Sequence, residues 1–261
     1  MFQDLLDSLP IWGVFALFAF AALLLYELGF RFGRWYQGRT PEEKEGPTGM
    51  LVGSILALMA FLLAITMGMA TDRFDTRRGA VLSEANSIGT TYLRAGYLPE
   101  PASSQSRELL REYVPLRIAP DDLAGVPALL ARSDEILTEL WEIAEQLAKD
   151  TPDSEVLGLY IESLNETIDM NTVRVTAGLF ARVPGTIVLL LFIGSTLTLG
   201  MVGYSAGLTG RRSPLTAVVL VVVLGAVIRL VIDIDRPTGG TLTTSQQPLI
   251  MLQEQIGPPG Q

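Results

Sequence analysis

The segment Thr48–Asp72, TGMLVGSILALMAFLLAITMGMATD, decides the fold. It carries no charge until its last residue, and at about 1.5 Å per residue a helix of this length crosses a hydrocarbon core of about 30 Å. The next residues are charged but still helical in pattern, and no proline interrupts them before Pro99. We therefore predict a transmembrane helix that continues well beyond the bilayer.

Small side chains recur along this helix every three or four residues, which places them on one face. They are Gly49, Gly53, Ala57, Ala60, Ala64 and Gly68. One interpretation is that a neighbouring helix packs closely on this small-residue stripe, and the glycine pair of a later span, Gly203 and Gly207, is the expected contact. The other is that the stripe lines an oligomeric pore. In that case the larger side chains that flank the pore are Leu56, Phe61, Leu63 and Met67.

A cluster of charged residues follows the apolar run. Its members are Asp72, Arg73, Asp75, Arg77 and Arg78. Carboxylates and arginines three or four residues apart on a helix can pair, so the cluster can be a solvated collar. If the helices surround a pore, it becomes a charged ring at the pore mouth, and such a ring sets ion preference.

Composition places the chain among integral membrane proteins. Of its 261 residues 49% are hydrophobic, and the mean hydropathy is +0.37. There is no histidine and no cysteine, which removes the commonest general base and the commonest soft metal ligands. No nucleophile elbow or phosphate-binding glycine loop occurs either, so we expect no enzyme, no cofactor and no metal site.

Three further apolar runs have membrane-spanning length: Ile11–Phe30, about Pro184–Gly207 and Leu215–Ile234. The last of them contains Arg229, and Asp233 follows four residues later on the same helix face. A charged residue at this depth is costly unless it is paired or reaches water. We therefore predict a membrane-edge ion pair, with a gate or ion-pathway role as the alternative.

Between Thr71 and Val183 the chain is polar and acidic, with 19 acidic and 11 basic residues. These residues account for −8 of the net charge of −9, which argues against nucleic acid as a partner. Apolar residues at helical spacing predict helices here, one of them from about Pro127 to Lys149. The acidic residues are expected to form a solvated face, and a cation site is the alternative.

These features predict an all-α, polytopic membrane protein with four transmembrane helices and a helical extramembrane domain inserted between helices 2 and 3. The predicted parts are the first transmembrane helix and loop (1–47), the second helix with its extension (48–94), the acidic helical domain (95–183), the third and fourth transmembrane helices (184–234) and the C-terminal tail (235–261).

Several segments resemble a family of bestrophin-like bacterial membrane proteins with a domain of unknown function. They are EANSIGTTYLRAGYLPEP and RELLREYVPLRI after the second span, GYSAGLTGRRS after the third, and IDRPTGGTLTTSQQPL after the fourth. The most specific family motif comprises Asp235, Arg236, Pro237, Ser245, Gln246 and Pro248. By similarity to bestrophins, the resemblance implies a homo-oligomeric anion channel whose second helix lines the pore.

The expected partners are the lipid bilayer, further copies of the chain and inorganic ions. The N-terminal tail has no basic residue, whereas the first loop holds Arg31, Arg34, Arg39 and Lys44. We expect a protein of the cell (inner) membrane, and by the positive-inside rule both termini and the acidic domain lie outside the cytoplasm. The alternative is a cytoplasmic domain, which is favoured by the bestrophin resemblance and by the basic residues near the membrane on the domain side, Arg73, Arg77, Arg78, Arg174, Arg182 and Arg236. The alternative to a channel is a membrane-anchored sensor or scaffold that binds a partner through the acidic domain. A transporter is less favoured because the two pairs of spans show no internal repeat.

Overall fold

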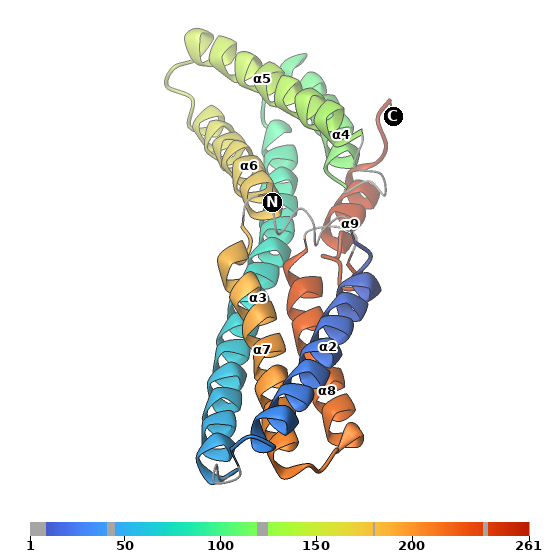
Figure 1. The fold of residues 1–261 in the computed structure, drawn as a ribbon. Coiled ribbons are helices and arrows are strands. Elements are labelled where there is room, and N and C mark those ends of the chain that lie inside the picture. Colours follow the sequence, from blue (N-terminus) through green and yellow to red (C-terminus); the bar gives the residue numbers. More distant parts are fainter. Residues whose placement is uncertain (1–8, 41–44, 119–124, 180, 237–239, 261) are drawn as a thin grey trace. The chain divides into compact units, whose positions relative to one another are not determined.

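The computed structural model describes residues 9–40, 45–118, 125–179, 181–236 and 240–260. All regular secondary structure in these residues is helical, in eight helices labelled α2 to α9 (Figure 1). The chain forms two compact units. The first consists of Met1–Phe74 and Arg182–Thr243, and the second of Asp75–Ala181 and Thr244–Gln261.

The first unit contains the four predicted spans, and each is confirmed as a helix long and apolar enough to cross a membrane. They are α2 (Ile11–Gln37), the first part of α3 (Glu45–Ala95), α7 (Gly185–Thr209) and α8 (Pro214–Asp235). Proline precedes α7 and opens α8, where its missing N–H costs no helical hydrogen bond. Gly210, with φ of 67°, ends α7 in the left-handed conformation that glycine adopts most easily.

Helices α2 and α7 approach each other through glycines. A Cβ atom added at Gly203 or Gly207 of α7 would collide with the carbonyl oxygen of Tyr26 or Phe30 in α2. Gly29 and Gly33 of α2 face the α7 backbone in the same way. The expectation that Gly203 and Gly207 pack on the small residues of α3 is therefore wrong, because α2 occupies their face.

The second unit packs the remainder of α3 with α4 (Ala102–Arg117), α5 (Val126–Asp150), α6 (Glu155–Leu179) and α9 (Gln247–Ile256). Its core holds fully buried large side chains, among them Leu110, Tyr113, Ile136, Leu140, Tyr160 and Leu164. The predicted helix from about Pro127 to Lys149 is confirmed as α5. Helix α9 was not predicted, and it buries Leu249, Leu252 and Ile256 in this core.

Candidate functional site

The small-residue stripe of α3 is exposed in the chain. Gly53, Ala57, Ala60, Ala64 and Gly68 all lie at the surface, as does the neighbouring Phe61. A Cβ atom added at Gly49, Gly53 or Gly68 would meet no atom within 4 Å. Within the described residues, no helix of the same chain therefore packs against this face.

The opposite face of α3 packs into the first unit. Val52, Met59, Leu63, Thr66 and Ala70 are buried there. Leu63 and Ala70 belong to the apolar core shared with α2, α7 and α8. Helix α3 thus has one face packed in the core of the first unit and an opposite face that is exposed.

The charged residues beyond the stripe do not share one face. Asp72, Asp75 and Arg78 are exposed, and they follow Gly68 by four, seven and ten residues, which places them in line with the stripe. Arg77 is only 5% exposed, and its guanidinium donates to the carbonyl oxygen of Ala181 at 3.4 Å. The predicted place of Arg77 at a pore mouth does not agree with this burial, because Arg77 lies on the face of α3 opposite the stripe. Arg73 is also exposed, on another face of the helix.

The predicted membrane-edge ion pair is not formed. The Asp233 carboxylate accepts hydrogen bonds from both the backbone N–H, at 2.7 Å, and the hydroxyl of Thr241. The Arg229 guanidinium lies 4.2 Å from the ring centroid of Trp12 in α2. The i,i+4 spacing permitted the pair, but Thr241 and Trp12 provide alternative partners from other parts of the first unit.

The residues of the family motif connect helix ends. Asp235, 3% exposed, accepts from the backbone N–H of Val183 at 2.8 Å and lies 3.5 Å from Arg182 Nε. Arg236 donates to the carbonyl oxygen of Leu9 at 2.9 Å. Pro237 lies outside the described residues. These contacts fasten the end of α8 to the start of α7 and to the segment before α2.

The second half of the motif opens α9. The Ser245 hydroxyl accepts from the backbone N–H of Gln247 at 3.3 Å, and Pro248 occupies the first turn of the helix. The Gln246 side chain accepts from Arg174 of α6 at 2.8 Å. These three residues therefore have a structural role at the start of the helix that completes the second core.

Sequence reasoning missed a buried ion cluster in the second unit. Glu84 of α3 is fully buried, and its carboxylate accepts from Arg117 Nε of α4 at 2.6 Å and from Arg174 of α6. Burial raises the pKa of the adjacent Tyr113 hydroxyl, whose ring lies beneath the Arg117 guanidinium. The partners are 33 and 90 residues from Glu84 in the sequence, so no local spacing could reveal them.

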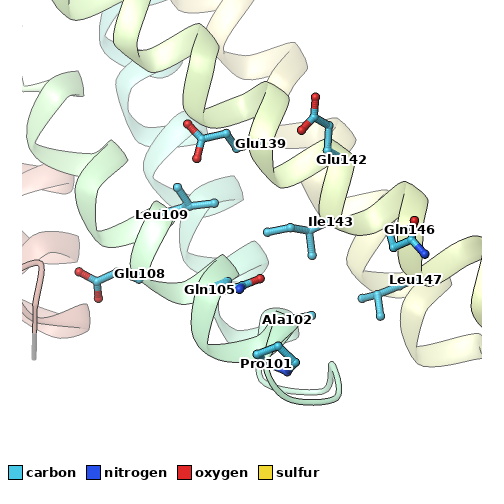
Figure 2. Close-up of a pocket in the computed structure, with 10 residues that line it drawn as sticks. All are labelled: Pro101, Ala102, Gln105, Glu108, Leu109, Glu139, Glu142, Ile143, Gln146 and Leu147. Carbon is cyan, nitrogen blue, oxygen red and sulfur yellow. The ribbon is translucent and has the colours of Figure 1, made fainter.

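A groove of about 700 Å³ lies between α4 and α5 in the second unit. Figure 2 shows Leu109 and Ile143 facing each other across it, with Glu139 and Glu142 along the α5 side and Glu108 on α4. Glu139 pairs with Arg132 at 2.9 Å, and Glu108 pairs with Arg111 at 3.3 Å. The groove is thus apolar inside with glutamates at its rim. In the described part of the chain, no three acidic side chains gather closely enough to hold a metal ion.

Comparisons with known proteins support the resemblance found in the sequence. The structure is similar to crystal structures of a bacterial bestrophin homologue from Klebsiella pneumoniae. One variant aligns with a TM-score of 0.65 at 17% identity, over 92% of this chain and 95% of that one. A second aligns with a TM-score of 0.64 at 18% identity, over 94% and 96% of the two chains.

No curated protein matches the chain. At 17–18% identity the structural matches show a common fold alone. The comparison with protein families gives further support, because the bestrophin-like domain matches residues 13–249, which include the four spans except the first two residues of α2, and most of the second unit. The chain therefore belongs to the bestrophin-like domain family.

Proposed function

We propose that the protein is a homo-oligomeric ion channel of the inner membrane, in which α3 from each copy lines the pore. The observation that carries this proposal is the open face of α3. Its small side chains are uncovered in the chain, while the opposite face is packed. Copies arranged around an axis would cover the open face and leave a path between the helices.

The exposed faces of two other spans differ from the stripe. Helix α2 exposes Phe20, Leu24 and Leu28, and α8 exposes Val222 and Val223. Large apolar side chains suit contact with lipid tails, whereas glycine and alanine suit close helix approach. The stripe therefore fits an assembly of helices better than it fits a lipid surface.

The charges in line with the stripe favour cations. Bestrophin resemblance implies an anion, yet two of the three exposed charged residues that continue the stripe are carboxylates, Asp72 and Asp75, and the third is Arg78. Arg77 is buried on the other side of α3. Rings of carboxylates at a pore mouth attract cations and repel anions. Among the residues predicted for the mouth, we therefore assign ion preference to Asp72 and Asp75.

Ion flux through the purified protein in liposomes tests the proposal. We expect potassium flux to exceed chloride flux, and Ala60→Leu to reduce it because the larger side chain narrows the pore. Ala226→Leu is the matched control, since Ala226 is exposed on α8 among the valines. No flux from a folded, oligomeric protein contradicts the channel, and equal reduction by both variants contradicts the assignment of α3 to the pore.

We further propose that the second unit is the extramembrane domain and that it lies outside the cytoplasm, on the basis of the basic first loop. The chain contains no cysteine, so single introduced thiols report on orientation directly. A membrane-impermeant maleimide added to intact cells should label Asp153→Cys and spare Thr40→Cys. The reverse labelling would place the second unit in the cytoplasm.

The groove between α4 and α5 supports the alternative function, a scaffold that binds a partner protein. Its apolar interior and glutamate rim fit the apolar face of a basic amphipathic helix. Binding of such a peptide by the wild type, lost in Ile143→Asp, together with absence of flux, would favour the scaffold. Flux without peptide binding would favour the channel.

A further inference from the structure

A second cavity lies in the first unit, where α7 and α8 meet at their connecting turn. Its volume is about 660 Å³, and its walls come from α2, α3, α7, α8 and the turn. Because α7 and α8 are both candidate spans joined by four residues, this turn lies at a membrane surface. The cavity therefore opens where lipid headgroups are found.

Hydroxyl groups gather in this cavity. Ser205, Thr209, Ser213 and Thr216 contribute side chains to its lining. The hydroxyls of Ser213 and Thr216 are 2.6 Å apart, so one donates to the other and one O–H is left for a further acceptor. Ser205 makes no side-chain hydrogen bond to any residue that the structure describes. The cavity thus offers at least two hydroxyl donors, Ser205 and one member of the Ser213–Thr216 pair, that do not already donate to a described residue.

The cavity also contains a guanidinium that no carboxylate neutralises among the described residues. Arg211 lines it and is exposed. The adjacent Arg212 differs, since it pairs with Glu27 at 3.1 Å and lies 4.5 Å from the Phe30 ring centroid. Glu27 is also engaged by Arg31 at 2.8 Å. Glu27 is therefore already shared by two arginines, and Arg211 forms no ion pair with any residue that the structure describes, so its guanidinium can bind an anion.

We propose that this cavity binds the phosphate of an anionic phospholipid headgroup. Arg211 donates charge-assisted hydrogen bonds to the phosphate oxygens, and the hydroxyls of Ser205 and of the Ser213–Thr216 pair donate to the remaining ones. Val52 and Val202 form an apolar wall of the same cavity, against which the upper part of an acyl chain can lie. This combination of one cation, several hydroxyls and an apolar wall matches a lipid better than a free anion.

Binding of dioctanoyl phosphatidylglycerol to the full chain in a neutral detergent tests the proposal. We expect saturable binding by the wild type, weakened about tenfold in Arg211→Gln, since a hydrogen bond to a charged group contributes that much to affinity. Ser205→Ala should weaken binding less. The control is Arg34→Gln, which removes the same charge from an exposed position on α2 outside the cavity. It should bind within about twofold of the wild type.

Three outcomes would overturn the proposal. These are an equal loss in both arginine variants, the absence of saturable binding to the wild type, and inorganic phosphate that binds as tightly as the lipid and displaces it. The last outcome would assign the cavity to a free phosphate. Because Arg211 is exposed in a turn, Arg211→Gln is expected to fold, and an unchanged melting temperature verifies this.

Discussion

The carboxylate of Glu84 and the guanidinium of Arg174 form an ion pair in the interior of the second unit, although 90 residues separate them in the sequence. Arg174 also donates to the carbonyl oxygen of Arg117 at 2.5 Å and to the Gln246 side chain at 2.8 Å. Arg117 in turn donates to Glu84 at 2.6 Å. One buried carboxylate therefore links α3, α4, α6 and the residue that precedes α9.

Glu84→Gln should strongly destabilise the second unit. The substitution leaves two largely buried guanidinium groups without a counter-charge, and breaking a buried pair in this way costs about 3–5 kcal/mol. Thermal unfolding of the purified protein, followed by circular dichroism, measures the effect. The control is Glu162→Gln, because Glu162 is 72% exposed in its pair with Arg94. This substitution should lower the free energy of unfolding by less than about 1 kcal/mol. Equal melting temperatures for the two variants would contradict a structural role for the cluster.

Gly203→Ala should impair folding of the first unit, whereas Gly53→Ala should not. The added methyl group at Gly203 collides with the backbone oxygen of Tyr26, and the one at Gly53 meets open space. A backbone can give way less than a side chain, so we expect a cost of at least about 1–3 kcal/mol at Gly203. The yield of folded protein in detergent and its melting temperature report on both variants. Similar values would mean that α2 and α7 are not held by this contact.

The sequence was sufficient to predict the four spans because the length of an apolar run and the absence of charge are local properties. The continuation of α3 past Asp72 was predictable for the same reason, since no proline interrupts it. Helix α9 was missed because only a few apolar side chains, Leu249, Leu252 and Ile256, identify it. Three apolar side chains do not predict a buried helix unless the core against which they pack is known.

Residues of the candidate site were harder to predict because their partners are distant in the sequence. The exposure of the small residues on α3 could not be read from their spacing, which suits packing and pore lining equally. The burial of Arg77 depends on Ala181, and the separation of Arg229 from Asp233 depends on Trp12. In each case a partner from a distant part of the sequence decided the outcome.

The pair between Glu112 and Arg132 should make the second unit less stable in acid. The hydrogen bond from Arg132, at 2.7 Å, lowers the pKa of the Glu112 carboxyl below its usual value of about 4.3. A carboxyl whose pKa is lower in the folded state contributes stability above its unfolded pKa, and loses it as the pH falls through the folded pKa. Since Glu112 is 41% exposed, the contribution should be below about 1 kcal/mol.

Comparison of wild type with Glu112→Gln measures this contribution. The two melting temperatures should differ at pH 6 and converge as the pH falls below the usual carboxyl pKa of about 4.3, where the carboxyl becomes protonated. Glu142→Gln is the control, since Glu142 is exposed on the neighbouring α5 and forms no ion pair in the described residues. A difference between wild type and Glu112→Gln that stays constant across this pH range would show that the effect of the substitution is not electrostatic.

Double-mutant cycles should separate the contacts of Asp233 from those of Arg229. Asp233→Ala combined with Thr241→Val should show a coupling free energy of about 1–3 kcal/mol, because the carboxylate accepts the Thr241 hydroxyl. Asp233→Ala combined with Arg229→Gln should be additive within about 0.5 kcal/mol. Arg229→Gln with Trp12→Leu should couple by about 0.5–2 kcal/mol through the cation–π contact. Unfolding in mixed micelles supplies the free energies. Two residues that do not interact with each other show no coupling free energy in such a cycle. Strong coupling between positions 229 and 233 would therefore contradict their separation and support the ion pair expected from their spacing.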